Sequence, residues 1–188
     1  MKKYLATFVV MGAFVAPAHA ADSYTTDPEF SIPVFEVTHL GFTTQHGRFN
    51  KTSGKAMIDF ATKKGSVDFT VYTESLDMGL GAWTKHLSDE GLFNVKKFPT
   101  MTFKSDKLIF EGDKVVAAEG QFTMIGVTKP LKVVVNDFQC GSNPENKKAM
   151  CAANVTATLK RSDFGLTKYI PAVSDEVKIT VPVEAYRN

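Results

Sequence analysis

The sequence predicts an all-β protein, a closed antiparallel barrel of about eight strands with one short helix at its flank. Apolar and polar residues alternate with a period of two in about eight segments, which is typical of strands with one buried face. Glycine, asparagine and aspartate fall between these segments at spacings suited to an antiparallel meander. Closing such a sheet into a barrel removes the exposed edges that would otherwise pair with other chains.

The expected strands follow one another along the whole chain after residue 20. Pro33, near the start of the first strand, indicates an edge or an irregular start. The fourth strand is expected to bend or end near Lys107. Met57 is placed among polar neighbours on the second strand, where a one-residue error would exchange the inner and outer faces. The strands are expected at residues 32–39, 54–60, 67–72, 101–106, 116–124, 131–136, 155–160 and 177–184.

One segment has helical rather than strand spacing. Trp83, Leu87 and Leu92 recur at intervals compatible with one face of a helix, and charged residues occupy the other side. The helical spacing stops at Phe93, and Pro99 marks the change to the alternation of the next strand. Because the helix is short, it needs packing against the sheet to persist.

The N-terminus is typical of a secretory signal. Two lysines precede an apolar run at residues 5–15, and an Ala-His-Ala cleavage sequence ends at Ala20. The run is shorter than the ~20 residues that a membrane-spanning helix needs. We therefore expect cleavage of a signal peptide at residues 1–20, a single domain at residues 21–188 and a periplasmic location, with secretion or surface exposure as variants.

The charge balance argues against a nucleic-acid partner. The chain has 22 basic and 20 acidic residues, and the surplus is the pair of lysines in the expected signal. Aromatic residues are not interleaved with a stripe of lysine and arginine, as they are in many nucleic-acid-binding proteins.

The two cysteines predict a disulfide. Cys140 and Cys151 flank a polar loop rich in turn-forming residues, which places them at the facing ends of a hairpin. In an oxidising compartment such a pair forms a bond. A metal site is a weak alternative, because no histidine or third cysteine lies nearby in sequence.

Motifs that carry catalysis are missing from the sequence. After residue 20 the histidines are His39, His46 and His86, and none has a metal-ligand spacing. There is no GxSxG sequence and no glycine-rich phosphate loop before a helix. We expect no enzymatic activity, no catalytic cofactor and no metal.

The composition leaves two interpretations of the barrel interior. The 15 phenylalanines and 7 methionines are generous for this length. Mixed with small residues such as Gly120 and Ala157, they can enclose an irregular apolar cavity. The same residues can also fill a solid core, and composition alone favours that alternative.

Polar residues at strand ends also allow two interpretations, a structural one and a ligand-binding one. Arg161 either forms a surface ion pair with Asp163, worth ~0–1 kcal/mol, or it closes one end of the barrel and neutralises the head group of a ligand. His39 and His86 are either structural hydrogen-bonding groups or ligand contacts.

Four segments resemble the YceI-like family, in the order in which that family has them. A single segment would be weak support, but four in order span nearly the whole of residues 21–188 and make a specific match. The segments are VTHLGFTTQHGRF, SLDMGLGAWTKHLSDEGLFNVKKFPTMTFKS, GQFTMIGVTKPLKVVV, and LKRSDFGL with the closing VKITVPVEAYRN.

The resemblance implies both a shape and a ligand. The shape is an extended, lipocalin-like barrel of eight antiparallel strands around an internal hydrophobic tunnel. The ligand is a long-chain isoprenoid, either a quinone such as ubiquinone or a polyprenyl pyrophosphate, which the protein would carry, store or sequester. The alternative is a stress-response or surface-interaction protein that uses the barrel as a scaffold without lipid transport.

Under this interpretation large apolar residues line the tunnel, and polar residues at its mouth contact the head group. The candidates for head-group contacts are His39, His86 and Arg161. Transient contact with a membrane surface and pairing of two barrels are compatible with the role, and no sequence feature decides either. The candidate lining residues are Phe42, Met57, Phe69, Trp83, Leu87, Phe93, Phe103, Phe122, Met124 and Phe164.

One departure from the family pattern bears on the head group. The family's helix commonly opens with an Arg-Asp pair two residues before a His-Leu dipeptide, where this chain has Trp83 and Thr84. The replacement makes this region more apolar. We therefore expect a neutral quinone head group rather than a pyrophosphate.

Overall fold

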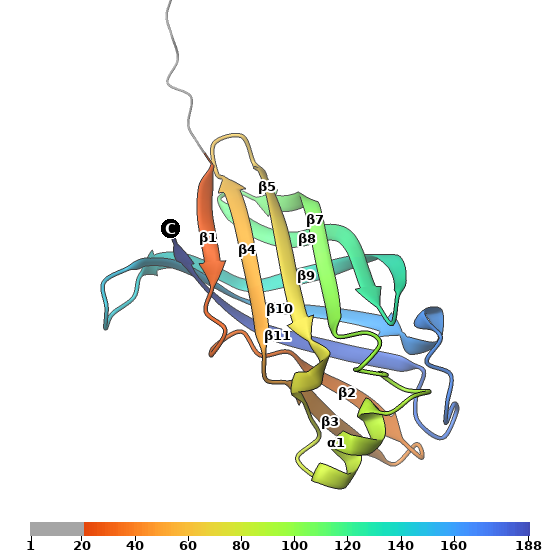
Figure 1. Ribbon diagram of the computed structural model, residues 1–188. Coiled ribbons are helices and arrows are strands. Elements are labelled where there is room, and N and C mark those ends of the chain that lie inside the picture. Colours follow the sequence, from red (N-terminus) through yellow and green to blue (C-terminus); the bar gives the residue numbers. More distant parts are fainter. Residues whose placement is uncertain (1–20) are drawn as a thin grey trace, which may run out of the picture.

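The computed structural model describes residues 21–188, so the expected signal peptide lies outside the described residues. The described chain forms one continuous sheet with an α-helix and two short 3-10 helices (Figure 1). No helix within residues 21–188 is long and apolar enough to span a membrane. The strands are β1 (Asp22–Thr26), β2 (Val34–His39), β3 (Thr43–Phe49), β4 (Thr52–Asp59), β5 (Lys64–Tyr72), β6 (Leu76–Asp77), β7 (Thr100–Glu111), β8 (Lys114–Met124), β9 (Val127–Ser142), β10 (Ala149–Lys160) and β11 (Glu176–Arg187). The helices are η1 (Thr73–Ser75), α1 (Gly81–Ser88) and η2 (Arg161–Phe164).

Eight strands form a closed antiparallel ring. Their hydrogen-bonded order is β1-β4-β5-β7-β8-β9-β10-β11, and β11 returns to β1. Closure depends on β1, where Tyr24 pairs with Arg187 on one side and with Ala56 on the other. The predicted eight-stranded antiparallel barrel is therefore confirmed.

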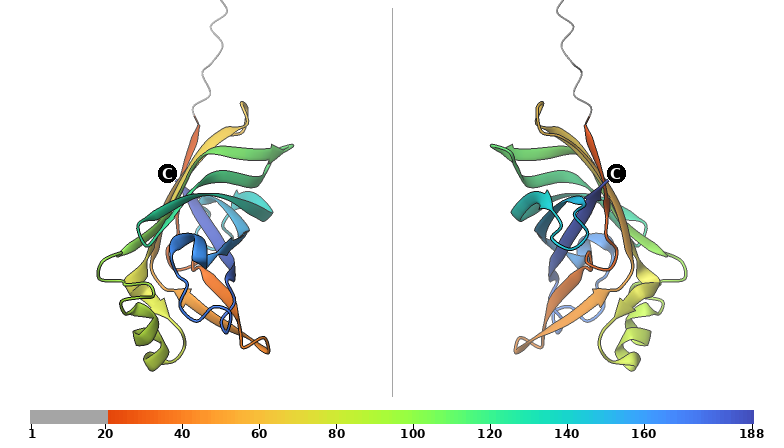
Figure 2. Two further views of the ribbon diagram at one scale, coloured as in Figure 1. Left: turned by 90° about the vertical axis from the view of Figure 1, so that its right-hand side faces the viewer. Right: turned by 90° about the vertical axis from the view of Figure 1, so that its left-hand side faces the viewer.

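The remaining strands widen one end of the barrel, which the strand predictions did not foresee. β2 pairs with β11 around Ile179, whereas β1 pairs with the same edge of β11 around Tyr186. The predicted strand at residues 32–39 is thus β2 and lies outside the ring, while β1 and β3 were missed. β3 adds to β2, and β6 adds to β3, at the end of the molecule where α1 lies (Figures 1 and 2).

The predicted inner faces are correct for most ring strands. On β5, Val67, Phe69 and Val71 all point into the barrel, as the alternation indicated. The same holds on β9, β10 and β11. The inward residues of those three strands include Leu131, Val133, Val135, Val155, Ala157, Leu159, Val177, Ile179, Val181 and Val183.

The predicted bend near Lys107 is a β-bulge rather than a strand end. The register between β7 and β8 shifts after Lys104, and the hydroxyl of Ser105 donates to the carbonyl of Glu119 at 2.7 Å. Gly120 lies against this bulge, where a Cβ would collide with the carbonyl oxygen of Lys104. Because bulges bend a strand and increase its twist, this one helps to curve the sheet into a barrel.

The helix is shorter than predicted. α1 ends before Leu92 and Phe93, and the chain turns back at Gly91, whose φ is 87°. The backbone N–H of Phe93 donates to the carbonyl of Leu87 at 3.0 Å. Leu92 and Phe93 therefore reach the apolar cluster through this loop rather than along a helix face. β7 begins directly after Pro99, as predicted.

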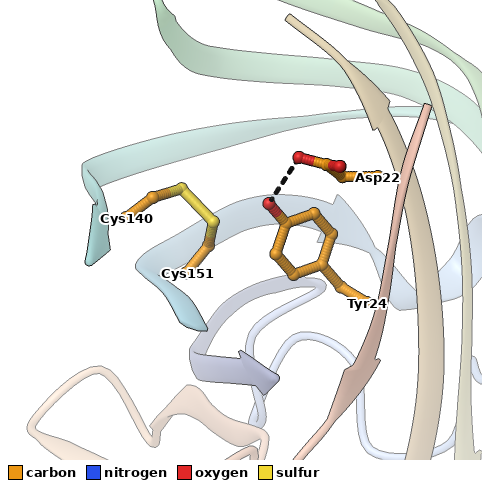
Figure 3. Close-up of a disulfide and its surroundings, with 4 residues drawn as sticks. All are labelled: Asp22, Tyr24, Cys140 and Cys151. Atoms are coloured by element: carbon orange, nitrogen blue, oxygen red, sulfur yellow. Dashed lines mark hydrogen bonds between the residues drawn. A yellow bond between two sulfur atoms is a disulfide. The ribbon is translucent and has the colours of Figure 1, made fainter. Parts of the chain in front are cut away.

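The disulfide lies between directly opposed positions of β9 and β10. Cys140 pairs with Cys151 in the register of the two strands, and their sulfur atoms are bonded (Figure 3). Cys151 is buried in an apolar cluster that also contains Tyr24 and Ala185. The bond therefore ties the β9–β10 hairpin at the end of the barrel that β1 closes.

Replacing both cysteines with alanine is expected to lower the free energy of unfolding by roughly 2–3 kcal/mol. The two cysteines are separated by 11 positions, and the stabilisation by a loop of that size comes mainly from restriction of the unfolded chain. Thermal unfolding followed by circular dichroism should show a melting temperature about 5–10 °C lower. A reducing agent should lower the melting temperature of the native chain but not that of the variant. Equal melting temperatures for the native chain with and without reductant would contradict the prediction.

Candidate functional site

The barrel encloses an apolar cavity of about 600 Å³. All eight ring strands contribute to its wall, together with α1, the loop after α1, β2 and the segment after η2. The volume lies within the range of ~300–1,000 Å³ that is typical of small-molecule sites. The interior is therefore hollow, which answers the question that composition left open.

Small side chains in the wall help to account for the space. Phe69, Phe103 and Phe122 line the cavity from neighbouring strands, yet alanine occupies several other positions of the wall. In a solid core those positions would hold branched aliphatic side chains that interdigitate with the rings. The small residues of the wall include Gly54, Ala56, Ala118, Ala153, Ala157 and Ala185.

Tyr24 and Cys151 line one end of the cavity. Figure 3 shows Tyr24 together with Asp22 and the disulfide. Tyr24 is buried, and its hydroxyl donates to Oδ2 of Asp22 at 3.5 Å. Burial, and to a smaller extent the Asp22 carboxylate, raises the pKa of Tyr24, so its side chain is neutral at physiological pH. This end is therefore apolar, with one uncharged hydroxyl at its boundary.

The other end of the cavity reaches the protein surface between α1 and the segment after η2. Trp83, His86 and Leu87 line it from α1, and Lys168 and Tyr169 line it from the other side. Nε2 of His86 lies 3.1 Å from the hydroxyl oxygen of Tyr169, which links the two sides by a hydrogen bond. Trp83 and Tyr169 are also solvent-exposed, so this end is the mouth of the cavity.

Arg161 organises the segment that forms one side of the mouth. Its side chain is buried, and its guanidinium donates to four backbone carbonyls at 2.8–2.9 Å. The acceptors are the carbonyl oxygens of Leu166, Lys168, Val173 and Ser174. Arg161 therefore stabilises residues 165–174 by hydrogen bonds, which use four of its five N–H groups.

Carbonyl dipoles rather than a direct ion pair surround the Arg161 charge. Burial lowers the pKa of Arg161, and the carboxylate of Asp175 acts in the opposite direction. Asp175 accepts hydrogen bonds from the hydroxyl and backbone N–H of Ser162, which lower the pKa of that carboxyl. The alternative of a surface ion pair between Arg161 and Asp163 is wrong, since no such pair occurs within residues 21–188.

Seven of the predicted lining residues lie in the cavity wall, and their contact with a ligand stays a prediction. His39 and His86 also border the cavity near its mouth. The seven residues are Phe69, Trp83, Leu87, Phe93, Phe103, Phe122 and Met124.

Three predicted lining residues lie elsewhere. Phe42 is at the tip of the β2–β3 hairpin and is 90% exposed. Met57 points outward from β4, because the small residues and Ile58 take the inner positions of that strand. Phe164 is buried behind the wall, where its ring meets the ring of Phe122 edge-on at 5.6 Å between centroids. For these three the prediction was wrong.

Sequence reasoning missed the segment at residues 165–173. Leu166, Tyr169 and Val173 border the cavity from this segment. Their spacing matches neither a strand nor a helix, so periodicity gives no signal for them. Tyr24 was missed for a related reason, because β1 has too few apolar residues to show alternation.

The cavity wall suits an apolar guest. In the part of the chain that the structure describes, no group of three or more histidine, cysteine, aspartate or glutamate side chains is placed to hold a metal ion. At the mouth, the polar groups of His86, Tyr169 and Arg161 are bonded to protein partners. Such an arrangement can enclose a long apolar chain and leave a polar end near the surface.

Comparison with known sequences identifies one family along most of the chain. The family model of the YceI-like domain matches residues 24–185. A UPF0312 protein of Pseudomonas aeruginosa (strain LESB58) is 32% identical, with 100% of this chain and 99% of the relative covered. A UPF0312 protein of Shewanella putrefaciens (strain CN-32 / ATCC BAA-453) is 31% identical, with 100% of both chains covered.

Comparison with solved structures finds the same fold. The crystal structure of Burkholderia cenocepacia BcnA superposes with a TM-score of 0.69 at 22% identity, over 85% of this chain and 98% of that one. A Campylobacter jejuni YCEI protein gives 0.66 at 25% identity, over 80% and 90%. A polyisoprenoid binding domain from Saccharophagus degradans gives 0.64 at 16% identity, over 90% and 100%.

Proposed function

This chain belongs to the YceI-like family, and we propose that it binds a long-chain isoprenoid lipid inside its barrel. The observation that carries the proposal is the apolar cavity of about 600 Å³ inside the barrel, which opens to the surface between α1 and the segment after η2. The polyisoprenoid-binding description of the Saccharophagus degradans neighbour agrees with a ligand of this class.

The tail of such a lipid supplies the driving force for binding. Each buried CH₂ contributes ~0.8 kcal/mol, so the roughly 15 carbon atoms of three isoprene units contribute ~12 kcal/mol by this measure. Association itself costs ~4–15 kcal/mol in lost freedom of motion. Affinity should therefore rise with tail length, and tails of one or two units should bind weakly.

We further propose that the head group is a neutral, ubiquinone-type quinone. A pyrophosphate needs several cationic donors that converge on it. At the mouth, Arg161 is committed to backbone carbonyls, and Lys168 Nζ lies over the ring of Tyr169, 5.0 Å from its centroid. A quinone carbonyl needs only one hydrogen bond, which His39 or His86 can donate.

The proposed location is the periplasm, where the protein would carry, store or sequester its lipid. Two features support an oxidising compartment outside the cytoplasm: the Cys140–Cys151 disulfide and the signal-like sequence at residues 1–20. The role is that of a binding protein and involves no chemical step.

Purified protein is expected to release an isoprenoid lipid into organic solvent, identified by mass spectrometry. Added ligand can be followed through Trp83, which is the only tryptophan and lies at the cavity mouth. A ubiquinone with a tail of three isoprene units should quench the Trp83 fluorescence and saturate at one ligand per protein. It should bind more tightly than farnesyl pyrophosphate, which has the same tail. Geraniol, farnesol and geranylgeraniol, added as competitors, should bind in increasing order of affinity.

The Trp83→Phe variant controls for the fluorescence signal. It should lose the quenching yet retain the lipid in solvent extracts, because the phenyl ring preserves an apolar mouth. Recovery of no isoprenoid, together with no binding of any added ligand, would reject the proposal and favour a scaffold role without lipid.

A further inference from the structure

Exposed apolar side chains gather around the mouth of the cavity. Among the residues that the structure describes, six of the nine exposed large hydrophobic residues belong to three segments at this end. The segments are the β2–β3 hairpin tip (residues 39–46), α1 with the residue before it (80–88) and the segment after η2 (165–173). We call them together the mouth surface. The six residues are Leu40, Phe42, Leu80, Trp83, Tyr169 and Ile170.

Direct contacts join the three segments into one surface. The backbone N–H of Leu40 donates to the carbonyl of Ala172 at 2.6 Å, which ties the hairpin tip to the segment after η2. The hydrogen bond between His86 and Tyr169 ties that segment to α1. Figure 2 shows that the hairpin tip and α1 reach the same end of the molecule, on either side of the segment after η2.

Two of the exposed residues occupy unfavourable backbone conformations. Leu40 has a φ of 54° and Tyr169 a φ of 68°. Side chains of this size are rare in the left-handed region, where glycine and asparagine are preferred. Leu40 is more than half exposed, so burial does not account for its size, whereas Tyr169 also borders the cavity and bonds to His86. A bulky apolar residue held outward at a strained position, as Leu40 is, indicates a functional use.

Basic side chains outnumber acidic ones on the mouth surface. Its three segments contain Lys85, Lys168 and three histidines, and no aspartate or glutamate. Two carboxylates border it: Asp89 Oδ2 lies 3.6 Å from Lys85 Nζ, and Glu36 Oε1 lies 3.4 Å from His46 Nε2. Exposed aromatic side chains flanked by lysine are typical of proteins that sit at the surface of anionic membranes.

We propose that the mouth surface docks on a lipid bilayer that contains anionic lipids, with the cavity mouth facing the membrane. The inference rests on the proposed function. An isoprenoid ligand resides in membranes, so a docked barrel would let it pass into the cavity without crossing water. A second copy of the chain is a poorer occupant. A symmetric contact would bring two cationic surfaces together and close both mouths.

Co-flotation with vesicles tests the proposal. Wild-type protein should float with vesicles of phosphatidylethanolamine and phosphatidylglycerol and weakly with vesicles of phosphatidylcholine alone. The double variant Leu40→Asn, Phe42→Ser should reduce the partition coefficient about tenfold or more, because it removes two exposed apolar side chains. Its melting temperature should be unchanged or higher, since asparagine tolerates the left-handed conformation at position 40 better than leucine does.

The control variant is Val134→Ser, which removes an exposed apolar side chain from the outer face of β9, away from the mouth surface. It should float like the wild type. Absence of wild-type flotation, or equal flotation of the double variant, overturns the proposal. The proposal is also overturned, in favour of self-association, if the wild type does not bind vesicles but forms a dimer in analytical ultracentrifugation and the double variant is a monomer.

Ligand binding without vesicles separates this proposal from the proposed function. The double variant leaves the cavity wall intact, so the ubiquinone with three isoprene units should still quench Trp83 fluorescence. Vesicle binding without any quinone binding would support the docking surface and contradict the isoprenoid proposal. Quinone binding by a wild-type protein that does not float would contradict the docking surface alone.

Discussion

Replacing Arg161 with methionine is expected to lower the free energy of unfolding by about 3–5 kcal/mol. The substitution leaves four backbone carbonyls of residues 165–174 without their donor. An unsatisfied buried acceptor costs ~1–3 kcal/mol, and water that enters the loosened segment recovers part of the loss. The melting temperature should fall by about 10 °C.

Circular dichroism gives the melting temperature, and amide hydrogen exchange locates the effect. Exchange should increase first at residues 165–174, where the arginine acts, and only later in β10 and β11. The matched control is Arg48→Met, since Arg48 forms a solvent-exposed ion pair with Asp77, and exposed pairs contribute little to stability. Equal losses in the two variants would show that Arg161 has no special structural role.

The Arg161→Lys variant separates charge from geometry. Lysine keeps the positive charge but has a single ammonium in place of the planar fork, so it cannot reach four carbonyls that surround the guanidinium. We expect it to recover less than half of the lost stability. Full recovery by lysine would mean that the charge, rather than the hydrogen bonds, stabilises the segment.

The barrel could be predicted from sequence because its longest strands bury one face only. On β5 and β9 the apolar side chains fall at every second residue, and the register follows directly. Met57 shows where this reasoning fails. The inner positions of β4 are Gly54, Ala56 and Ile58, so Met57, which lies between two of them, faces outward.

The strands that close and widen the barrel show weaker patterns in the sequence. β1 has the sequence DSYTT, in which Tyr24 is the only fully buried residue. β3 is largely polar and carries Gly47, where a Cβ would collide with the ring of Phe35. Both strands are held by pairing with distant segments rather than by a pattern of their own, so local periodicity cannot reveal them.

The mouth depends on tertiary contacts that no single segment encodes. Arg161 was a candidate head-group contact, but the carbonyls that surround it belong to a loop without periodicity. Phe42 was assigned to the lining because it is large and apolar, and the hairpin turn carries it to the surface. The family resemblance indicated a hollow interior correctly, whereas composition alone favoured a filled one.

The Ala157→Phe substitution is expected to weaken binding of long isoprenoids by about a hundredfold or more. Ala157 lines the cavity on β10, between the apolar clusters at its two ends. A phenyl ring there takes the space of several chain carbons, and loss of three to four buried CH₂ groups corresponds to roughly 2.7 kcal/mol. Stability should change little or increase, because the ring fills existing space rather than displacing packed atoms.

Tail length makes the Ala157→Phe result specific to the cavity. In the wild type, affinity should rise from geraniol through farnesol to geranylgeraniol, since each added isoprene unit reaches further toward Tyr24. In the variant the increase in affinity should stop at the tail length at which the new ring blocks the cavity. The ligands with the longest tails should therefore lose the most affinity. The matched control is Thr158→Phe, which adds the same ring to the next residue of β10, on the exposed face. Equal weakening by both variants, or an unchanged dependence on tail length in a folded Ala157→Phe protein, would place the lipid outside the barrel.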